Sequence, residues 1–186
     1  MKSDSGLTVP VVGVAGYKHV GKTTLICGMV QKFSSQGLRV GVLKHDAHGF
    51  VATPEGTDTH AFAEAGAMAV AIASPDGHVA GEWRLSTEPS LAELVARVGR
   101  VDLVIAEGFK SSEIVKWVLL SEIDRARSGY VMPDFCHDAG RVEKVLGWLV
   151  PGPPYQVAED SRGVYDRNDI ETICERTLQT FGFGVG

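Results

Sequence analysis

The feature that most constrains this chain is a loop bracketed by two glycines close to residue 20. Residues Gly16 to Thr23, with the sequence GYKHVGKT, match the pattern G-x-x-x-x-G-K-[ST] of phosphate-binding loops. Such a loop needs a buried strand before it and a helix after it, because helix N–H groups complete the phosphate cradle. Val9–Ala15 is an apolar, β-branched run, and Thr23–Phe33 carries apolar residues at helical spacing. The sequence therefore predicts a phosphate site on a strand–loop–helix unit.

Strand-like and helix-like segments alternate along the rest of the chain. Gly37 ends the first helix, and the apolar run Leu38–Lys44 predicts a second strand parallel to the first, joined by a right-handed crossover. Met68–Ala73 is expected to be a third buried strand, followed by the turn Pro75-Asp76-Gly77 and by Glu82–Leu85 as its hairpin partner. Further strands are expected at Val101–Ala106, Lys116–Leu120 and Val145–Val150. The tract 45–59 is expected to be a long, functional loop.

Three more helices are expected. One covers His60–Ala65, and one spans Leu91 to Val98 with Ser86 or Thr87 as its cap. The third follows Asn168, which is taken as the cap with Glu171 in the capping-box position. The alternation predicts one α/β domain over residues 1–186, a three-layer P-loop NTPase fold with a mostly parallel central sheet.

Composition excludes several classes of protein. The chain of 186 residues is 44% hydrophobic with a net charge of −5, and its lysines and arginines form no large cluster, so a nucleic-acid binder is not expected. No apolar run reaches the ~20 residues of a membrane span. The N-terminus, with Lys2 followed by an apolar stretch, resembles a secretory leader, but Asp4 stands where positive charge belongs, which favours a cytoplasmic protein. The three cysteines, Cys27, Cys136 and Cys174, define neither a disulfide framework nor a zinc site.

The chemistry expected at the loop follows from its residue types. Lys22 would bridge the β- and γ-phosphates of a nucleotide, and the Thr23 hydroxyl would ligate Mg²⁺. Glu107 stands at the end of an apolar strand and would complete the ligand shell of the metal. Gly108, the next residue, lets the chain turn sharply. Asp46, after the second strand, would hold metal-bound water or position an attacking group, although a solvated loop carboxylate is an equal alternative.

Other polar residues near the expected site have open roles. The loop histidines His48 and His60 fit surface positions better than catalytic ones. Lys110 and Lys116 follow Glu107 and would bind a second anionic ligand or only solubilise the surface. The chain carries no N-K-x-D or T-K-x-D motif for guanine, no evident water-orienting glutamine and no obvious arginine finger, so fast hydrolysis is not expected.

The chain resembles the molybdopterin-guanine dinucleotide biosynthesis protein B (MobB) family of bacteria and archaea. The resemblance rests on four stretches in the same order: GYKHVGKTTL at 16–25, LKH at 43–45, GTDT at 56–59 with AGA at 65–67, and AEGFK at 106–110. Weaker similarity follows in IVK at 114–116 and in DRND at 166–169.

The resemblance implies a GTP-binding accessory protein with weak GTPase activity, usually a homodimer. It implies work beside the nucleotidyltransferase that joins GMP to molybdopterin, with molybdopterin itself as a further possible ligand. The nucleotide-binding residues expected are Gly16, His19, Val20, Gly21, Lys22, Thr23 and Thr24, with Thr23 and Glu107 on Mg²⁺. Lys22, Asp46 and Glu107 are the catalytic candidates.

Two alternatives stay open. In a P-loop kinase, Asp46 would take a proton from a substrate hydroxyl, but an arginine-rich lid would have to come from Arg125, Arg127 and Arg141. In a metallochaperone-type GTPase, the side chains that hold the metal would be those of His45, Asp46, His48, Cys136 and His137.

Overall fold

The computed structural model describes residues 6–46, 49–50, 52–121, 144–152 and 162–184, which separate into two units. The first is built from residues up to His45 and from Ser90 onward, and the second is Asp46–Pro89. The single domain over 1–186 stays a prediction.

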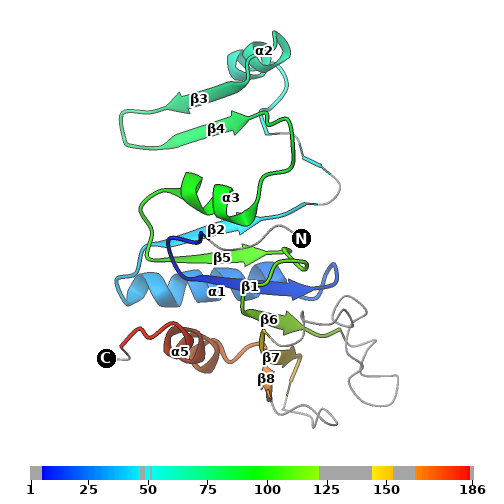
Figure 1. Cartoon of the computed structure of the whole chain (residues 1–186), viewed down its shortest axis with the longest axis vertical. Helices are drawn as coiled ribbons and strands as arrows, with labels where there is room; N and C mark the ends of the chain where they lie inside the picture. Colours follow the sequence, from blue (N-terminus) through cyan, green and yellow to red (C-terminus); the bar gives the residue numbers. More distant parts are fainter. Residues whose placement is uncertain (1–5, 47–48, 51, 122–143, 153–161, 185–186) are drawn as a thin grey trace. The chain divides into compact units, whose positions relative to one another are not determined.

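A six-stranded sheet organises the first unit, and every neighbouring pair in it is parallel. From edge to edge the strands are β2 (Val40–Lys44), β5 (Leu103–Glu107), β1 (Val11–Gly16), β6 (Lys116–Leu119), β7 (Val145–Val150) and β8 (Val164–Asp166) (Figure 1). The first two strands are parallel, as predicted, but β5 lies between them. The carboxyl ends of all six strands therefore share one edge of the sheet, where ligands of such sheets bind.

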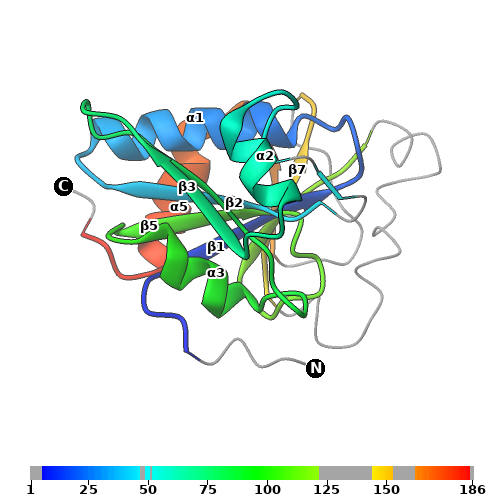
Figure 2. The same cartoon turned by 90° about the horizontal axis from the view of Figure 1, so that it is seen from above.

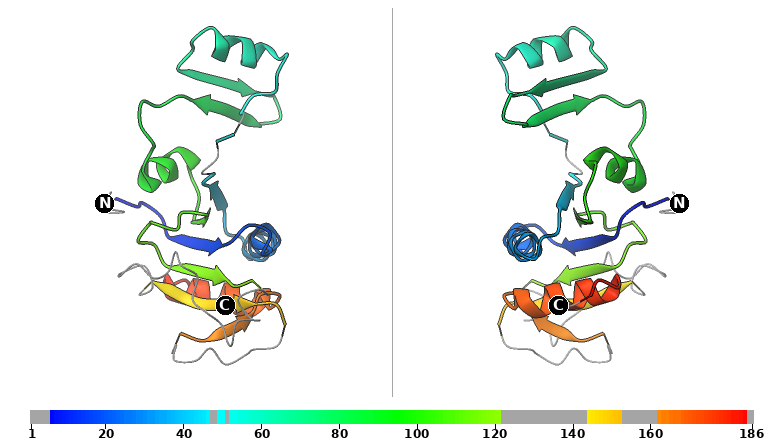
Figure 3. Two further views of the ribbon diagram at one scale, coloured as in Figure 1. Left: turned by 90° about the vertical axis from the view of Figure 1, so that its right-hand side faces the viewer. Right: turned by 90° about the vertical axis from the view of Figure 1, so that its left-hand side faces the viewer.

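Helices cover both faces of this sheet. The helices α1 (Lys22–Ser35) and α5 (Ile170–Thr180) pack on one face, and α3 (Leu91–Val98) packs on the other. Figures 2 and 3 show α1 and α3 on opposite sides of the strands. Strand residues alternate accordingly, since Val12 faces α1 and α5 while Val11 faces α3. The predicted three-layer α/β fold with a parallel sheet, of the P-loop NTPase kind, is confirmed.

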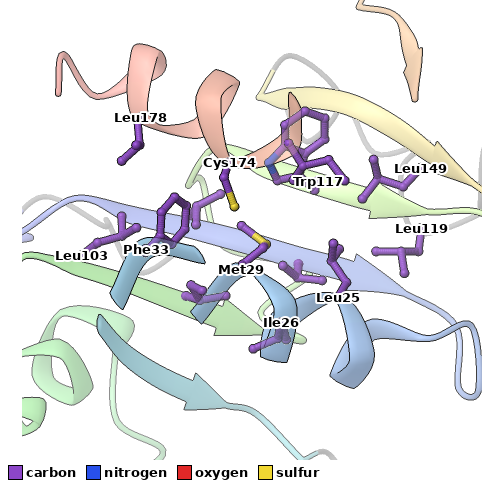
Figure 4. Close-up of a cluster of buried hydrophobic side chains, with 14 of the residues drawn as sticks. Leu25, Ile26, Met29, Phe33, Leu103, Trp117, Leu119, Leu149, Cys174 and Leu178 are labelled. Atoms are coloured by element: carbon purple, nitrogen blue, oxygen red, sulfur yellow. The ribbon is translucent and has the colours of Figure 1, made fainter. Parts of the chain in front are cut away.

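The main core lies between the sheet and the helices α1 and α5 (Figure 4). Met29 and Phe33 of α1 are fully buried there with Cys174 and Trp117. The Trp117 indole N–H donates to the Thr177 hydroxyl at 2.9 Å, so its one polar atom is satisfied inside the core. Burial raises the pKa of the Cys174 thiol to about 12, so this cysteine packs as an unreactive apolar group.

Two predicted helix caps are wrong, by three or four residues for α3 and by one residue for α5. Ser90 caps α3, with Glu93 completing the capping box, because only Ser90 has a glutamate three residues later at the start of the apolar stripe. Asp169 caps α5 in place of Asn168, and its carboxylate accepts the Thr172 N–H at 3.1 Å.

The second unit holds the helix α2 (Asp58–Glu64) and a two-stranded antiparallel sheet of β3 (Ala69–Ala73) and β4 (Val79–Trp83). The predicted hairpin is confirmed, with Ala69 opposite Trp83, but its second strand starts at Val79 and not at Glu82. The prediction that Met68–Ala73 is a buried strand is wrong: within β3 only Val70 is buried. Its apolar run resembles a core strand, but in the described part of the second unit only α2 packs on β3, and most of the strand stays exposed.

The short strand β8 was not expected, because three residues give too short a pattern to read. No helix in the described ranges combines the length and apolar character that crossing a bilayer requires.

An ion pair at the amino ends of two strands gives a test by pH. Arg39 donates to Asp102 from its backbone N–H and its guanidinium, at 2.7 to 3.0 Å, which ties the chain before β2 to the residue before β5. These hydrogen bonds, first of all those from the Arg39 side chain, lower the pKa of Asp102 to about 2 from 3.8. Because the folded-state pKa is depressed, the stabilisation is present above about pH 4 and is lost as pH falls through 2.

Asp102→Asn should therefore lower the free energy of unfolding at pH 7, and the difference from wild type should vanish near pH 2. Urea unfolding at several pH values between 2 and 7 measures this difference. Arg39→Met, which removes the partner, should behave in the same way. A difference that stays constant over this pH range would contradict the assignment.

Candidate functional site

The predicted phosphate loop joins β1 to α1 at the carboxyl edge of the sheet (Figure 1). A side chain at Gly16 is excluded, because its Cβ would lie 2.9 Å from both the Leu119 carbonyl oxygen and the Val20 Cγ2. Gly21, the residue before the helix, has φ 92°, a left-handed backbone that favours glycine. His19 has φ 63°, and no other non-glycine residue in the described ranges has a positive φ. The loop is thus a tight turn of specific backbone geometry.

The start of α1 presents a row of open donors. In the described part of the chain, the backbone N–H groups of Gly21, Lys22, Thr23 and Thr24 donate to no protein acceptor. The first helical hydrogen bond runs from the Leu25 N–H to the Gly21 carbonyl at 3.1 Å. These donors, together with the roughly half a positive charge of the helix N-terminus, form a site suited to phosphate oxygens.

Lys22 lies back across its own loop. Its Nζ donates to the Tyr17 carbonyl at 2.8 Å and lies 3.9 Å from the Glu107 Oε1. Both side chains are largely screened from solvent, at 14% and 15% exposed. The structure therefore brings together the two charged residues that the sequence placed on the phosphate and the metal.

The surroundings of Lys22 carry excess positive charge. Loss of solvent around the ammonium lowers the pKa of Lys22, Glu107 raises it, and the positive charges of Lys110 and Lys44 lower it further. Lys110 also lies over the Tyr17 ring, with its Nζ 5.7 Å from the ring centre. Three ammonium groups around one carboxylate favour the binding of a multiply charged anion.

Glu107 is held by the pairing of β5 with β2. Lys44 is its register partner, and the next residue, His45, donates its backbone N–H to the Glu107 carbonyl at 2.9 Å. Gly108 has φ 96°, and a Cβ there would lie 2.9 Å from the His45 carbonyl oxygen. The His45 ring packs on the Phe109 ring, with centroids 5.4 Å apart. This packing fixes the carboxylate at the edge of the loop.

The residues at the loop fit a magnesium ion that is shared with phosphate. Thr23, exposed on the first turn of α1, and Glu107 offer the oxygen ligands that Mg²⁺ prefers. Across the described ranges, no three His, Cys, Asp or Glu residues cluster as a metal-binding group. In proteins, Mg²⁺ usually keeps waters and phosphate oxygens as most of its ligands.

Other predicted residues are placed differently. Lys116 is only 4% exposed and donates to the carbonyls of Ser112 at 2.7 Å and Lys110 at 3.3 Å, so it supports the turn after β5 and is not an anion ligand. Asp46 begins the second unit, and its catalytic role stays a prediction. His60 lies on α2. The remaining candidates lie outside the described residues: His48, Arg125, Arg127, Cys136, His137 and Arg141.

One residue at the loop was missed by sequence reasoning. Arg167, between β8 and α5, donates from its Nη1 to the Val20 carbonyl at 3.0 Å. The stretch Asp166–Asp169 was noted only as a similarity to a family, with no role for its arginine.

Comparison with known families places the chain. Residues 11–132 match the sequence profile of the family described as "Molybdopterin guanine dinucleotide synthesis protein B" (MobB). That match covers well over half of the chain and includes the phosphate loop, Glu107 and the whole second unit.

Individual relatives agree with this match. The "molybdopterin-guanine dinucleotide biosynthesis adapter protein" of Haemophilus influenzae is 34% identical over 117 residues, covering 60% of this chain and 63% of that protein. The Escherichia coli K12 protein of the same name is 31% identical over 122 residues, covering 61% of this chain and 67% of that protein. The crystal structure of a "molybdopterin-guanine biosynthesis protein B (mobB)" is 27% identical with a TM-score of 0.64, covering 91% of this chain and 99% of that chain. The chain thus spans less than two thirds of the Haemophilus relative.

The geometry of the loop predicts the effect of removing its lysine. Lys22→Ala should weaken the binding of inorganic tripolyphosphate about 10- to 100-fold, because a charge-assisted hydrogen bond contributes about 1.5–3 kcal/mol. Calorimetry with tripolyphosphate measures this without involving a nucleotide base. Lys32→Ala is the control, since Lys32 is on the same helix but pairs with Glu171 at 2.6 Å. Equal affinity of wild type and Lys22→Ala would refute the phosphate site.

Proposed function

Because this chain belongs to the MobB family, we propose that it is a GTP-binding accessory protein of molybdenum-cofactor biosynthesis. In this role it assists the attachment of GMP to molybdopterin, which forms molybdopterin guanine dinucleotide. The observation that carries the proposal is the combination of this family membership with an open phosphate cradle next to Lys22 and Glu107.

The cradle supports a nucleotide triphosphate as the ligand. The open N–H groups of Gly21–Thr24 would contact phosphate oxygens, and Lys22 would exchange its bond to the Tyr17 carbonyl for one to phosphate. Gly16, His19 and Val20 shape the turn that wraps these oxygens. Thr23 and Glu107 would hold Mg²⁺, which when bound neutralises part of the phosphate charge. GTP, and not ATP, is proposed from the family resemblance.

Hydrolysis is proposed to be slow. Fast GTPases orient an attacking water with a dedicated side chain and stabilise the transition state with an arginine. Glu107 is the carboxylate that pairs with Lys22, and its proposed place on the metal leaves it unable to serve as the base. Binding of GTP, more than its turnover, is then the functional event, which suits an accessory protein in the cytoplasm.

The partner proposed is a MobA-type molybdopterin guanylyltransferase. The Haemophilus and Escherichia relatives are named adapter proteins, and an adapter acts by contact with another protein. One nucleotide site in a chain of 186 residues fits an assisting role.

A homodimer is proposed to form through the second unit. Val79 and Trp83 lie on the same side of β4 and are 70% and 51% exposed. Val79 and Trp83 share an apolar face of the hairpin with Ala69 and Ala71. Val70, which points to the opposite face, is buried, and α2 packs on β3. Because a two-stranded hairpin is marginal alone, a second copy paired on this face would stabilise it.

The function is tested by reconstitution. Wild-type protein with Mg²⁺ and GTP should increase the yield of molybdopterin guanine dinucleotide made by a purified MobA-type guanylyltransferase, and Lys22→Ala should not. Calorimetry should show tighter binding of GTP than of ATP. ATP preference with phosphorylation of a small molecule would instead support the kinase, and stoichiometric metal retained after purification would support the metallochaperone.

The dimer is tested by replacing its proposed contact residues. Val79→Ser with Trp83→Ser should raise the dimer dissociation constant at least about tenfold, because exposed aromatic anchors dominate such contacts. Sedimentation velocity over a range of concentrations measures the change. Val42→Ser is the control, since Val42 is 46% exposed on β2 of the first unit. A wild-type protein that stays monomeric at high concentration would exclude the dimer.

A further inference from the structure

Arg167 is fixed in place by the short turn that joins β8 to α5. Its backbone N–H donates to the Val150 carbonyl at the end of β7, at 2.9 Å. On either side of it, the Asp166 carboxylate accepts the Asn168 N–H at 2.8 Å, and Asp169 caps the following helix. The direction of the Arg167 side chain is therefore set by a turn that is hydrogen-bonded on both sides.

The guanidinium of Arg167 lies against the phosphate loop. Its Nη1 donates to the Val20 carbonyl at 3.0 Å, a contact between residues 147 positions apart. The same nitrogen lies 3.6 Å from where a Cβ of Gly21 would stand. Within the described ranges the Arg167 side chain has this one hydrogen bond and pairs with no carboxylate, so its charge is directed at the loop.

The Val20 carbonyl lies just before the N-cap residue Gly21, and it accepts from Arg167 instead of from a helix N–H. At the start of α1 the next carbonyl, that of Gly21, accepts from Leu25, but the Thr24 N–H does not donate to Val20. In a planar trans peptide the C=O and the N–H point in opposite directions, and the described chain has no cis peptide bond. Holding the Val20 carbonyl toward Arg167 therefore turns the Gly21 N–H to the opposite side, away from the guanidinium.

We propose that Arg167 is a positioning residue of the phosphate loop: it locks the Val20–Gly21 peptide so that the Gly21 N–H faces bound phosphate. This inference rests on the proposed phosphate site. The charged donor also polarises the peptide group, which makes the Gly21 N–H a better donor. Arg167 acts through the backbone of the loop, and the cradle is pre-organised before any ligand enters.

The test uses full-length protein and inorganic tripolyphosphate as the probe. Arg167→Gln removes the charge and the guanidinium, and Arg167→Lys keeps the charge but not the planar donor set. The matched control is Arg176→Gln, because Arg176 donates to the Leu146 carbonyl at 3.3 Å, away from the loop. Two quantities are measured: affinity by calorimetry, and the amide signal of Gly21 by NMR without ligand.

Arg167→Gln should weaken tripolyphosphate binding about tenfold and shift the free-state Gly21 amide signal, because one charge-assisted hydrogen bond is lost. Arg167→Lys should recover only part of the affinity, and Arg176→Gln should match wild type in both measurements. Thermal unfolding confirms that each variant is folded.

Unchanged binding in Arg167→Gln would overturn the inference, and so would full rescue by Arg167→Lys with an unshifted Gly21 amide, which indicates charge alone. Wild-type protein that binds no tripolyphosphate would instead overturn the proposed function. The two failures are thus distinct.

Discussion

The parallel pairing of β1 with β5 on one side and β6 on the other is the constraint on which the rest of the structure depends. It collects the carboxyl ends of the strands at one edge, so the phosphate loop, Glu107 and the turn held by Lys116 meet there although they are far apart in sequence. Because β1 is central and fully buried, the loop leaves a rigid base. The backbone geometry of the loop, which depends on its glycines, is therefore set by packing on β1 as well as by the conformational preferences of the glycines.

Charge at this edge is arranged for an anion that the protein does not itself supply. The positive charges of Lys44 and Lys110 lower the pKa of Lys22, and the negative charge of Glu107 raises it. Open N–H groups at the start of α1 add to the imbalance. This arrangement supports the polyphosphate ligand proposed above, because an anion bound there would reduce the repulsion between the ammonium groups.

Short-range patterns made the central part of the fold predictable from sequence. The phosphate loop, its flanking strand and helix, and the placement of Lys22 and Glu107 at one site follow from a local motif and from apolar runs. The insertion of β5 between β1 and β2 and the contact of Arg167 with the loop join distant segments, and no local pattern records them. The exposure of β3 was missed because an alanine-rich strand has the same apolar pattern in a core or on a surface.

The bond from Arg167 to Val20 also has a consequence during synthesis of the chain. Its two ends are separated by 147 residues, and ribosomes add about 5–20 residues per second, so the loop exists for roughly 7 to 30 s before its anchor is made. During that interval the nascent chain carries an incomplete cradle. The loop can therefore take its final, anchored geometry only after the segment following β8 has emerged, which couples the shape of the loop to completion of the fold.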